Sequence, residues 1–256
     1  MRSLWNGSIG FGLVNIPVKL FSAVQNSHLD LDMLDSKDHA KIKFQRINEN
    51  TKKEVPYNKI VKGYLMDEKY VILEDKDFEE ASPEKTKMIE LENFVDIGDI
   101  NPIYYETSYY AQPEKQGKKA YGLLLKALIK SKKAGVARFV LRSTENLCVI
   151  HPLGTVLVVT KIRFQEEIRA YDDLELPARD TVSDKELELG MSLIKQYTSD
   201  FDIKSFKDEY NRDLLKIIKS KAKGKKAPVK KVRQRVDTDD DLYGQLMQSL
   251  SSKRGG

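Results

Sequence analysis

The sequence contains a single cysteine, Cys148, and only three histidines among its 256 residues. One thiol excludes an internal disulfide and any zinc site built from several cysteines, and His28, His39 and His151 lack the spacing of metal ligands. Cys148 lies in the apolar run Leu147–Ile150, which predicts a small buried side chain and not a reactive thiol. We therefore expect no metal and no cofactor.

Long apolar runs and familiar catalytic motifs are missing as well. No stretch approaches the roughly 18 consecutive apolar residues of a membrane-spanning helix, and the first residues do not follow the basic-then-apolar pattern of a signal peptide. The phosphate-binding loop, Gly-x-Ser-x-Gly and His-Glu-x-x-His are absent, and Gly7, Gly10 and Gly12 have the wrong spacing for a dinucleotide site. We expect a cytoplasmic protein that has no membrane partner and is not an enzyme.

Charged residues make up 32% of the chain, above the ordinary level of about 25%, and they are unevenly distributed. Nine basic residues and no acidic one lie between residues 219 and 235: Lys219, Lys221, Lys223, Lys225, Lys226, Lys230, Lys231, Arg233 and Arg235. The whole chain carries +5, so the remainder without these nine carries −4. The segment is too polar to bury a core, which predicts a disordered basic tail over residues 219–236. Nucleic-acid contacts elsewhere require basic residues that are gathered locally.

The first twenty residues carry the clearest strand pattern. Apolar side chains recur at strand spacing from Leu4 to Leu20, and glycines interrupt them as they do at bulges and at close approaches of two backbones. Pro17 cannot donate a ladder hydrogen bond, which limits the strand. The stretch predicts one glycine-kinked strand of the kind that lets a sheet curve into a barrel. Periodicity alone leaves open an ordinary N-terminal core strand.

The order of residues in this stretch resembles the opening of the bacterial Ku proteins, the homodimeric DNA-end binders of non-homologous end joining. The matching residues are Trp5, Gly7, Ser8, Ile9, Phe11, Gly12, Leu13, Val14, Asn15, Ile16, Pro17, Val18 and Lys19. A second stretch, from Asp99 to Tyr110, is similar to the core of the same proteins. The resemblance implies a mainly β fold with α-helices: a Ku-type β-barrel core with a bridging arm, followed by short helices and the basic tail.

The same resemblance implies a nucleoid-associated homodimer that closes a ring around double-stranded DNA ends and recruits a multidomain ATP-dependent DNA ligase. Because any broken end must be accepted, its contacts should go to phosphate and sugar. Residues 237–256 resemble the ligase-binding motif of these proteins, which makes Leu242, Leu246 and Leu250 the candidate partner-binding residues. Many bacterial Ku proteins carry a Cys-x-x-Cys pair where this chain has Asn48 and Thr51, so we expect a polar turn without zinc.

Hydrophobic periodicity predicts the remaining elements. Strands are expected over residues 41–47, in two parts of 61–74, over 88–91 and 94–97, and over 136–141, 147–151 and 156–164. Helices are expected briefly from Ser82, over residues 118–133, and after the capping boxes that begin at Ser183 and Ser205. The expected division is a barrel core with a DNA-encircling bridge over residues 1–175, a helical region over 176–218, the basic tail over 219–236 and a partner-binding motif over 237–256.

The candidate DNA contacts are basic residues on predicted strands, at the start of the predicted helix 118–133 and in the tail: Lys41, Lys43, Arg46, Lys118, Lys119, Arg138, Arg142, Lys161, Arg163, Lys225, Lys226, Lys230 and Lys231. Each could equally be a solvated surface cation. The alternative function is a basic-tailed scaffold that binds nucleic acid without encircling it. A transcription factor is not favoured, because the helix over 118–133 offers only lysines where base readout uses Arg, Asn or Gln.

Overall fold

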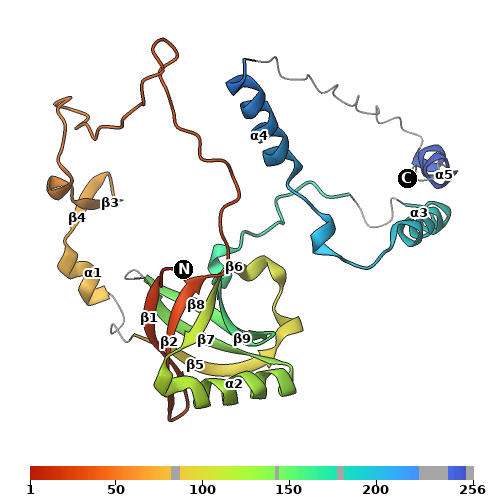
Figure 1. Cartoon of the computed structure of the whole chain (residues 1–256), viewed down its shortest axis with the longest axis horizontal. Coiled ribbons are helices and arrows are strands. Elements are labelled where there is room, and N and C mark those ends of the chain that lie inside the picture. The colour runs from red at the N-terminus through yellow and green to blue at the C-terminus, as the bar shows by residue number, and fades with distance from the viewer. Residues whose placement is uncertain (82–86, 142–143, 178–181, 225–241, 252–256) are drawn as a thin grey trace. The chain divides into compact units, whose positions relative to one another are not determined.

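The computed structural model of the chain describes residues 1–81, 87–141, 144–177, 182–224 and 242–251 (Figure 1). The chain divides into two compact units. The first comprises Met1–Asn26 and Asp32–Ala170, and the second comprises Ser27–Leu31 and Tyr171–Gly256. The predicted helical region, basic tail and partner-binding motif all fall in the second unit, and their limits stay a prediction.

Seven strands of the first unit close into a barrel in the order β1-β2-β6-β9-β8-β7-β5. The strands are β1 (Trp5–Phe11), β2 (Val14–Ser22), β5 (Met88–Asp96), β6 (Tyr105–Pro113), β7 (Lys133–Leu141), β8 (Thr144–Leu153) and β9 (Val156–Ile162). Neighbouring strands are antiparallel except β1 and β5, which pair in parallel over three positions, from Ser8 opposite Met88 to Gly10 opposite Glu90. The predicted barrel core is confirmed.

The opening stretch is a hairpin, so the prediction of one continuous kinked strand is wrong. Phe11 at the end of β1 pairs with Val14 at the start of β2. Gly12 lies between them at a φ of 57°, a left-handed conformation that glycine adopts without steric cost. Pro17 lies just before Val18, where the pairing of β2 with β6 begins. The chain therefore reverses at a glycine that the sequence pattern indicated only as a kink.

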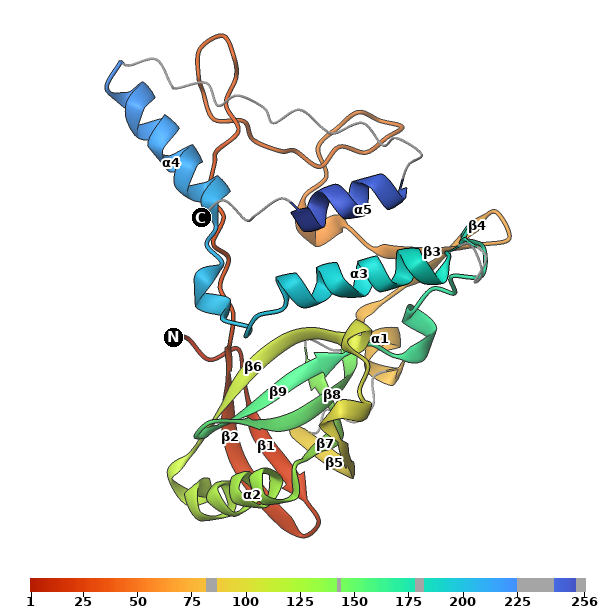
Figure 2. The same cartoon turned by 90° about the vertical axis from the view of Figure 1, so that its right-hand side faces the viewer.

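The helix α2 (Lys118–Ser131) closes one end of the barrel, as Figure 2 shows. Its Tyr121, Leu124 and Leu128 are buried and join the barrel core, whose largest fully buried side chains include Ile9, Ile16, Leu20, Ile89, Ile150 and Leu157. The predicted helix is confirmed. It ends at Lys132, which has a φ of 57°, and the strand β7 follows at once.

The Tyr121 hydroxyl joins two barrel strands at this end. It donates a hydrogen bond to the carbonyl of Ala111 on β6 and accepts one from the backbone N–H of Leu157 on β9, each at 2.7 Å. Ala111 and Leu157 are register partners, so the hydroxyl links two backbone groups that face each other. Burial raises the pKa of Tyr121, which keeps the hydroxyl protonated and able to donate.

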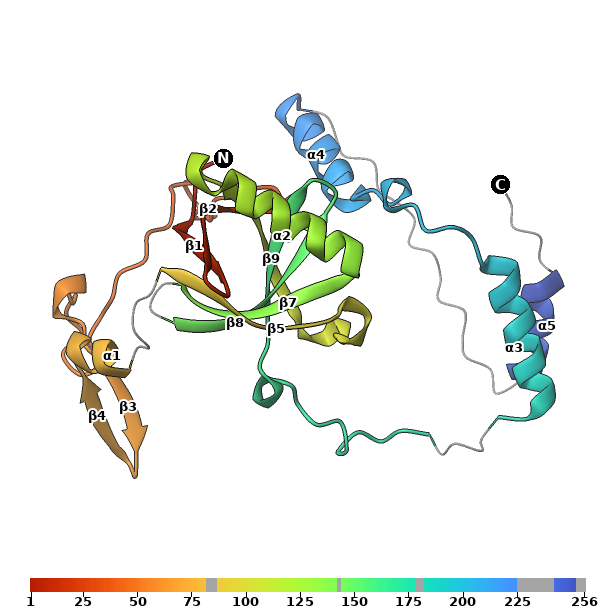
Figure 3. The ribbon, with the colours of Figure 1, turned by 90° about the horizontal axis from the view of Figure 1, so that it is seen from below.

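A long excursion from the barrel, residues 23–87, is called the arm below. It contains η1 (Tyr57–Lys59), the two-stranded sheet of β3 (Lys62–Met66) and β4 (Lys69–Leu73), and the helix α1 (Asp75–Ala81). Figure 3 shows this sheet standing apart from the barrel strands. The two strands predicted within residues 61–74 are confirmed as β3 and β4. The extended segments predicted at 88–91 and 94–97 are confirmed as the single strand β5, which ends at Asp96. The helix expected from Ser82 lies outside the described residues.

The prediction of a strand over residues 41–47 is wrong. Only the isolated bridges Leu34–Lys41 and Ile47–Glu54 form there, and Phe44 is 81% exposed. The segment alternates like a strand, but no neighbouring strand extends its ladder. The turn expected after it is present, because the Asn48 side chain accepts hydrogen bonds from the backbone N–H groups of Asn50 and Thr51, at 3.0 and 2.9 Å.

The second unit contains α3 (Asp184–Tyr197), α4 (Glu209–Ala222) and α5 (Leu242–Ser251). The capping box predicted at Ser183 and Glu186 is present. The box predicted at Ser205 is wrong, because Ser205 belongs to η6 (Ile203–Ser205) and Asp208 caps α4 by accepting from the N–H of Asn211 at 2.9 Å.

The remaining short turns are η2 (Ile97–Asp99), η3 (Pro102–Tyr104), η4 (Lys115–Gly117) and η5 (Gln165–Glu167). The three strands predicted after α2 are confirmed with shifted ends: β7 begins at Lys133, β8 continues through Pro152 to Leu153, and β9 ends at Ile162. None of the helices in the described ranges combines the length and apolarity needed to cross a bilayer.

Replacing Tyr121 by Phe should lower the free energy of unfolding by about 1–3 kcal/mol, because the buried Ala111 carbonyl and Leu157 N–H are each left without the hydroxyl as a partner. Chemical denaturation measures this change. The matched control is Tyr109→Phe on the same strand as Ala111, since the Tyr109 hydroxyl makes no hydrogen bond to any described residue. Equal stability of the two variants would contradict the linking role of Tyr121.

Candidate nucleic-acid interface

The opening motif begins on β1, whose pairing with β5 closes the barrel. We call this closure the seam. Trp5 donates a hydrogen bond from Nε1 to the carbonyl of Val140 on β7 at 3.1 Å, and its ring stands edge-on to Phe139 at a centroid distance of 6.1 Å. A Cβ atom on Gly7 would lie 2.3 Å from the Trp5 ring and 2.2 Å from the carbonyl oxygen of Lys87. The Trp-x-Gly pattern is therefore a packing requirement, in which glycine leaves room for the indole and for the returning chain.

The arm leaves and re-enters the barrel at one end. Leu20, near the end of β2, pairs with Trp5 at the start of β1, and β5 returns beside Ser8. The backbone N–H of Ser8 also donates to the carbonyl of Lys87 at 2.8 Å, where the arm ends. Both roots of the arm thus lie at the end of the barrel opposite α2.

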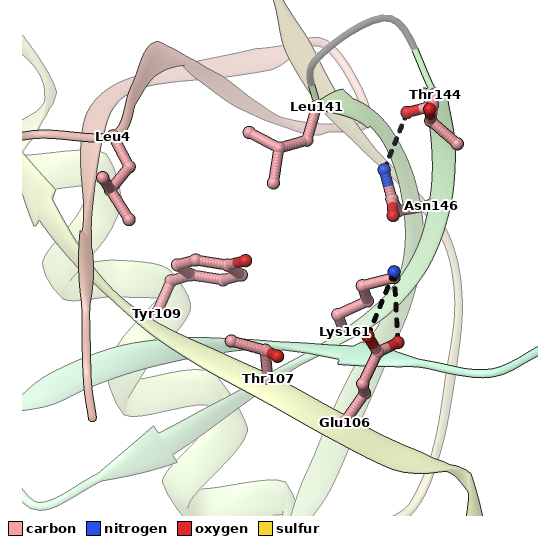
Figure 4. A pocket seen from close by; sticks show the side chains of 8 residues that line it. All are labelled: Leu4, Glu106, Thr107, Tyr109, Leu141, Thr144, Asn146 and Lys161. Carbon is pink, nitrogen blue, oxygen red and sulfur yellow. Dashed lines mark hydrogen bonds and ion pairs between the residues drawn. The ribbon is translucent and has the colours of Figure 1, made fainter. Parts of the chain in front are cut away.

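A polar cavity of about 310 Å³ lies at this end, which is called the mouth below (Figure 4). It is lined by Leu4, Glu106, Thr107, Tyr109, Leu141, Thr144, Asn146 and Lys161. Lys161 projects into it and forms an ion pair with Glu106 at 3.1 Å, while Asn146 donates to the carbonyl of Thr144 at 2.7 Å. The candidate Lys161 therefore has its charge compensated within the barrel.

Two further candidates on the barrel also have partners within the fold. Arg138 forms ion pairs with Glu92 at 2.8 Å and Glu145 at 3.2 Å, and the charge of Glu92 is the main cause that raises the pKa of Arg138. Arg163 donates to the carbonyls of Ile103 and Tyr105, at 3.2 and 2.8 Å. Arg142 lies outside the described residues. Arg138 and Arg163 stabilise local structure, and contact of any of the three arginines with DNA stays a prediction.

The candidates in the arm are more exposed. Lys41 forms an ion pair with Asp32 at 2.9 Å, in which both side chains remain largely accessible to solvent. Arg46 lies 5.2 Å from the centre of the Tyr57 ring, a cation–π contact that leaves the guanidinium at the surface. Lys43 is exposed and makes no ion pair with a described residue.

A larger basic set surrounds these three and was missed by reasoning from strand faces. Between residues 41 and 62 the basic residues are Lys41, Lys43, Arg46, Lys52, Lys53, Lys59 and Lys62, against Glu49 and Glu54 alone. We call residues 41–62 the basic stretch. All seven basic residues are exposed, and so are the aromatic rings of Phe44 and Tyr57. A charge count over this window would have found the stretch from the sequence.

The structure does not bring all the sequence-predicted residues together within one chain. Lys118 and Lys119 begin α2, at the end of the barrel opposite the mouth, and both are exposed. Lys225, Lys226, Lys230 and Lys231 lie outside the described residues. Within the part of the chain that is described, the basic stretch places seven exposed cations within 22 residues of the arm. We take it as a candidate for contact with a polyanion.

The candidate partner-binding residues lie on α5, where Leu246 and Leu250 are half-buried and Leu242 is exposed.

Cys148 is fully buried in the barrel core, as predicted, and burial raises the pKa of its thiol. Across the described ranges, no cluster of three or more His, Cys, Asp or Glu side chains could hold a metal ion.

Comparison with known proteins places this architecture in a family. Residues 10–189 match the Ku70/Ku80 beta-barrel domain. The chain is 36% identical over 236 residues to the "Non-homologous end joining protein Ku" of Coxiella burnetii, covering 90% of this chain and 86% of that protein. It is 37% identical to the protein of the same name from Archaeoglobus fulgidus, over 90% of this chain and 91% of that protein. It is 35% identical to the Bacillus subtilis protein of this name, over 90% of this chain and 75% of that protein. The closed barrel, the opening motif and these matches show that the chain belongs to the Ku family.

Proposed function

We propose that this chain binds double-stranded DNA ends without regard to sequence, as a homodimeric ring, and serves non-homologous end joining as a non-enzymatic platform that recruits an ATP-dependent DNA ligase. The relatives named above as non-homologous end joining proteins support the process. The observation that carries the proposal is the basic stretch, which presents seven exposed cations on an arm rooted at the mouth of a closed barrel.

The chemistry of the basic stretch fits a backbone contact. Six of its seven cations are lysines, whose ammonium groups attract phosphate as point charges. Base readout in the major groove relies instead on planar, bidentate groups such as those of Arg, Asn and Gln. Phe44, exposed beside the cations, offers a surface that can lie against sugar or an unpaired base. Binding of this kind does not distinguish one sequence from another.

The ring requires a second copy of the chain, and the β3–β4 hairpin has a surface suited to it. An isolated two-stranded hairpin is at best marginally stable in water. One face carries Leu65, Tyr70 and Ile72, which are 56%, 70% and 53% exposed and include no charge. The opposite face carries Lys62 and Lys69 among Tyr64, Met66 and Val71. We assign the uncharged face to the partner subunit and the basic face to DNA.

A ring accounts for selectivity toward ends without any base contact. A closed loop of protein can load only where the duplex terminates, so topology takes the role that base readout has in a sequence-specific protein. Two equal halves related by a two-fold axis suit the duplex, whose backbone has local two-fold symmetry. The alternative, a basic-tailed scaffold that does not encircle nucleic acid, would bind through phosphate attraction alone.

The affinities for linear and for circular DNA should distinguish an encircling ring from a scaffold that does not encircle nucleic acid. The purified protein should bind a linear duplex much more tightly than the same sequence as a covalently closed circle at matched salt, and blocking both ends after loading should trap the bound protein. Gel-shift and off-rate measurements report both effects. Equal affinity for the two forms would contradict the ring and leave the scaffold.

Charge reversal in the arm should weaken DNA binding. The variant Lys43→Glu/Arg46→Glu should lower the magnitude of the slope of log affinity against log salt by about 0.9 for each phosphate that the protein no longer neutralises. The matched control is Lys204→Glu/Lys207→Glu, which makes the same change in net charge at exposed positions that are not among the candidate DNA contacts. An equal decrease of affinity in both variants would point to net charge as the cause and would contradict a specific role of the basic stretch.

The dimer assignment predicts an asymmetry between the two faces of the hairpin. The variant Tyr70→Ser/Ile72→Ser removes apolar side chains from the uncharged face and should shift the protein to monomers in sedimentation velocity. The control Met66→Ser/Val71→Ser removes similar side chains from the opposite face and should leave the dimer intact. A dimer that survives the first variant would contradict the proposed contact.

A further inference from the structure

Two helices of the second unit, α3 and α5, pack against each other, as Figures 1 and 3 show. Among the described elements, α5 is the one that makes a substantial contact with α3. The α3 surface is divided into two apolar stripes. Leu189 and Leu193 are half-buried, whereas Leu187, Met191 and Ile194 are 58%, 59% and 64% exposed. One stripe is therefore covered and the other is open.

The α5 helix shows the same division. Leu246, Ser249 and Leu250 are half-buried and share one face at helical spacing, while Tyr243 and Met247 on the adjoining face are exposed. The covered stripe of α3 and the covered face of α5 are thus matched in chemistry, each centred on two leucines. Leu246 and Leu250 are also two of the three leucines assigned to ligase binding.

The α5 helix depends on this contact. It has only ten residues and includes Gly244, whereas isolated helices shorter than about 12–15 residues are marginal in water. A glycine within a helix costs roughly a further 1 kcal/mol relative to alanine. Burial of Leu246 and Leu250 against another helix supplies stabilisation that the segment itself lacks.

We infer that the Leu189–Leu193 stripe of α3 is an internal docking site for α5, and that a protein partner of α5 must displace α3 to reach Leu246 and Leu250. The docking rests on the contact between the two helices alone. That this protein partner is a DNA ligase rests on the proposed function. While α5 is docked on α3, its Leu246 and Leu250 are covered, so docking competes with binding of the ligase.

The size of the competition follows from the docking equilibrium. When α5 is docked ten times as often as it is free, the apparent affinity of an external partner falls about elevenfold. Substitutions that weaken the Leu189–Leu193 stripe should raise the apparent affinity of the external partner by the same factor. Substitutions of Leu187 and Met191 in the open stripe of α3 should leave that affinity unchanged.

Hydrogen exchange on the full-length protein tests the docking. The variant Leu189→Asp/Leu193→Asp should increase exchange of the α5 amides about tenfold or more, because α5 is deprived of the surface that keeps it helical. The matched control Leu187→Asp/Met191→Asp places the same charges on the open stripe and should leave α5 protected. The exchange should not depend on protein concentration. Equal exchange of α5 in the wild type and all variants, or protection that disappears on dilution, would overturn docking within the chain.

A second pair of variants guards against unfolding of α3 itself. Leu246→Asp/Leu250→Asp alters only α5 and should release it, while Tyr243→Asp/Met247→Asp on its exposed face should leave it docked. Equal exchange of α5 in these two variants would overturn the assignment of the docked face.

Titration with the purified multidomain ligase then separates the two proposals. Binding to the Leu189→Asp/Leu193→Asp variant should be about tenfold tighter than to its control. Equal ligase affinity for both would overturn the competition. If the ligase binds no form of the chain while exchange still reports docking, the recruitment proposed above fails and the docking of α5 stands.

Discussion

The parallel pairing of β1 with β5 is the constraint on which the rest of this structure depends. It spans only three residue pairs, yet it closes a seven-stranded barrel, and Trp5, accommodated by Gly7, ties the same seam to β7. Since β1 and β2 already form a hairpin, the chain must leave the barrel after β2 and return on the far side of β1. The arm is the segment that makes this connection, so the same seam that completes the core also sets both roots of the arm at the mouth.

Charge is partitioned by the same geometry. On the barrel, Arg138 and Lys161 meet carboxylates contributed by neighbouring strands, and Arg163 meets backbone carbonyls. These cations stabilise local structure, and their long-range attraction for an anion is much reduced. The basic stretch has only two carboxylates, Glu49 and Glu54, for its seven cations, and all seven cations remain exposed to solvent. A folded core with compensated charge and a basic stretch with surplus positive charge suit a protein that holds a polyanion without reading it.

Two small elements, the β3–β4 hairpin and α5, share a physical problem. Each exposes apolar surface and is too short to be stable alone. For the hairpin we propose a second copy of the chain as the covering surface. For α5 the covering surface is α3, and an external protein has to compete with it. Assembly and recruitment in this chain thus depend on elements whose stability comes from what they contact.

The amino-acid sequence by itself determined the family, the barrel class, the apolar stripe of α2 and the Ser183 capping box, because each is written in local spacing or in an unbroken run of residues. It did not determine that the opening stretch turns at Gly12, that residues 41–47 lack a strand partner, or that Arg138 faces Glu92. These features depend on which distant segments become neighbours: a strand pattern without an adjacent strand stays a loop, and a cation acts as a free charge only when the fold leaves it unpaired. Tertiary structure therefore decided which of the many basic residues remain available to bind, because only the closed barrel brings their carboxylate partners into reach.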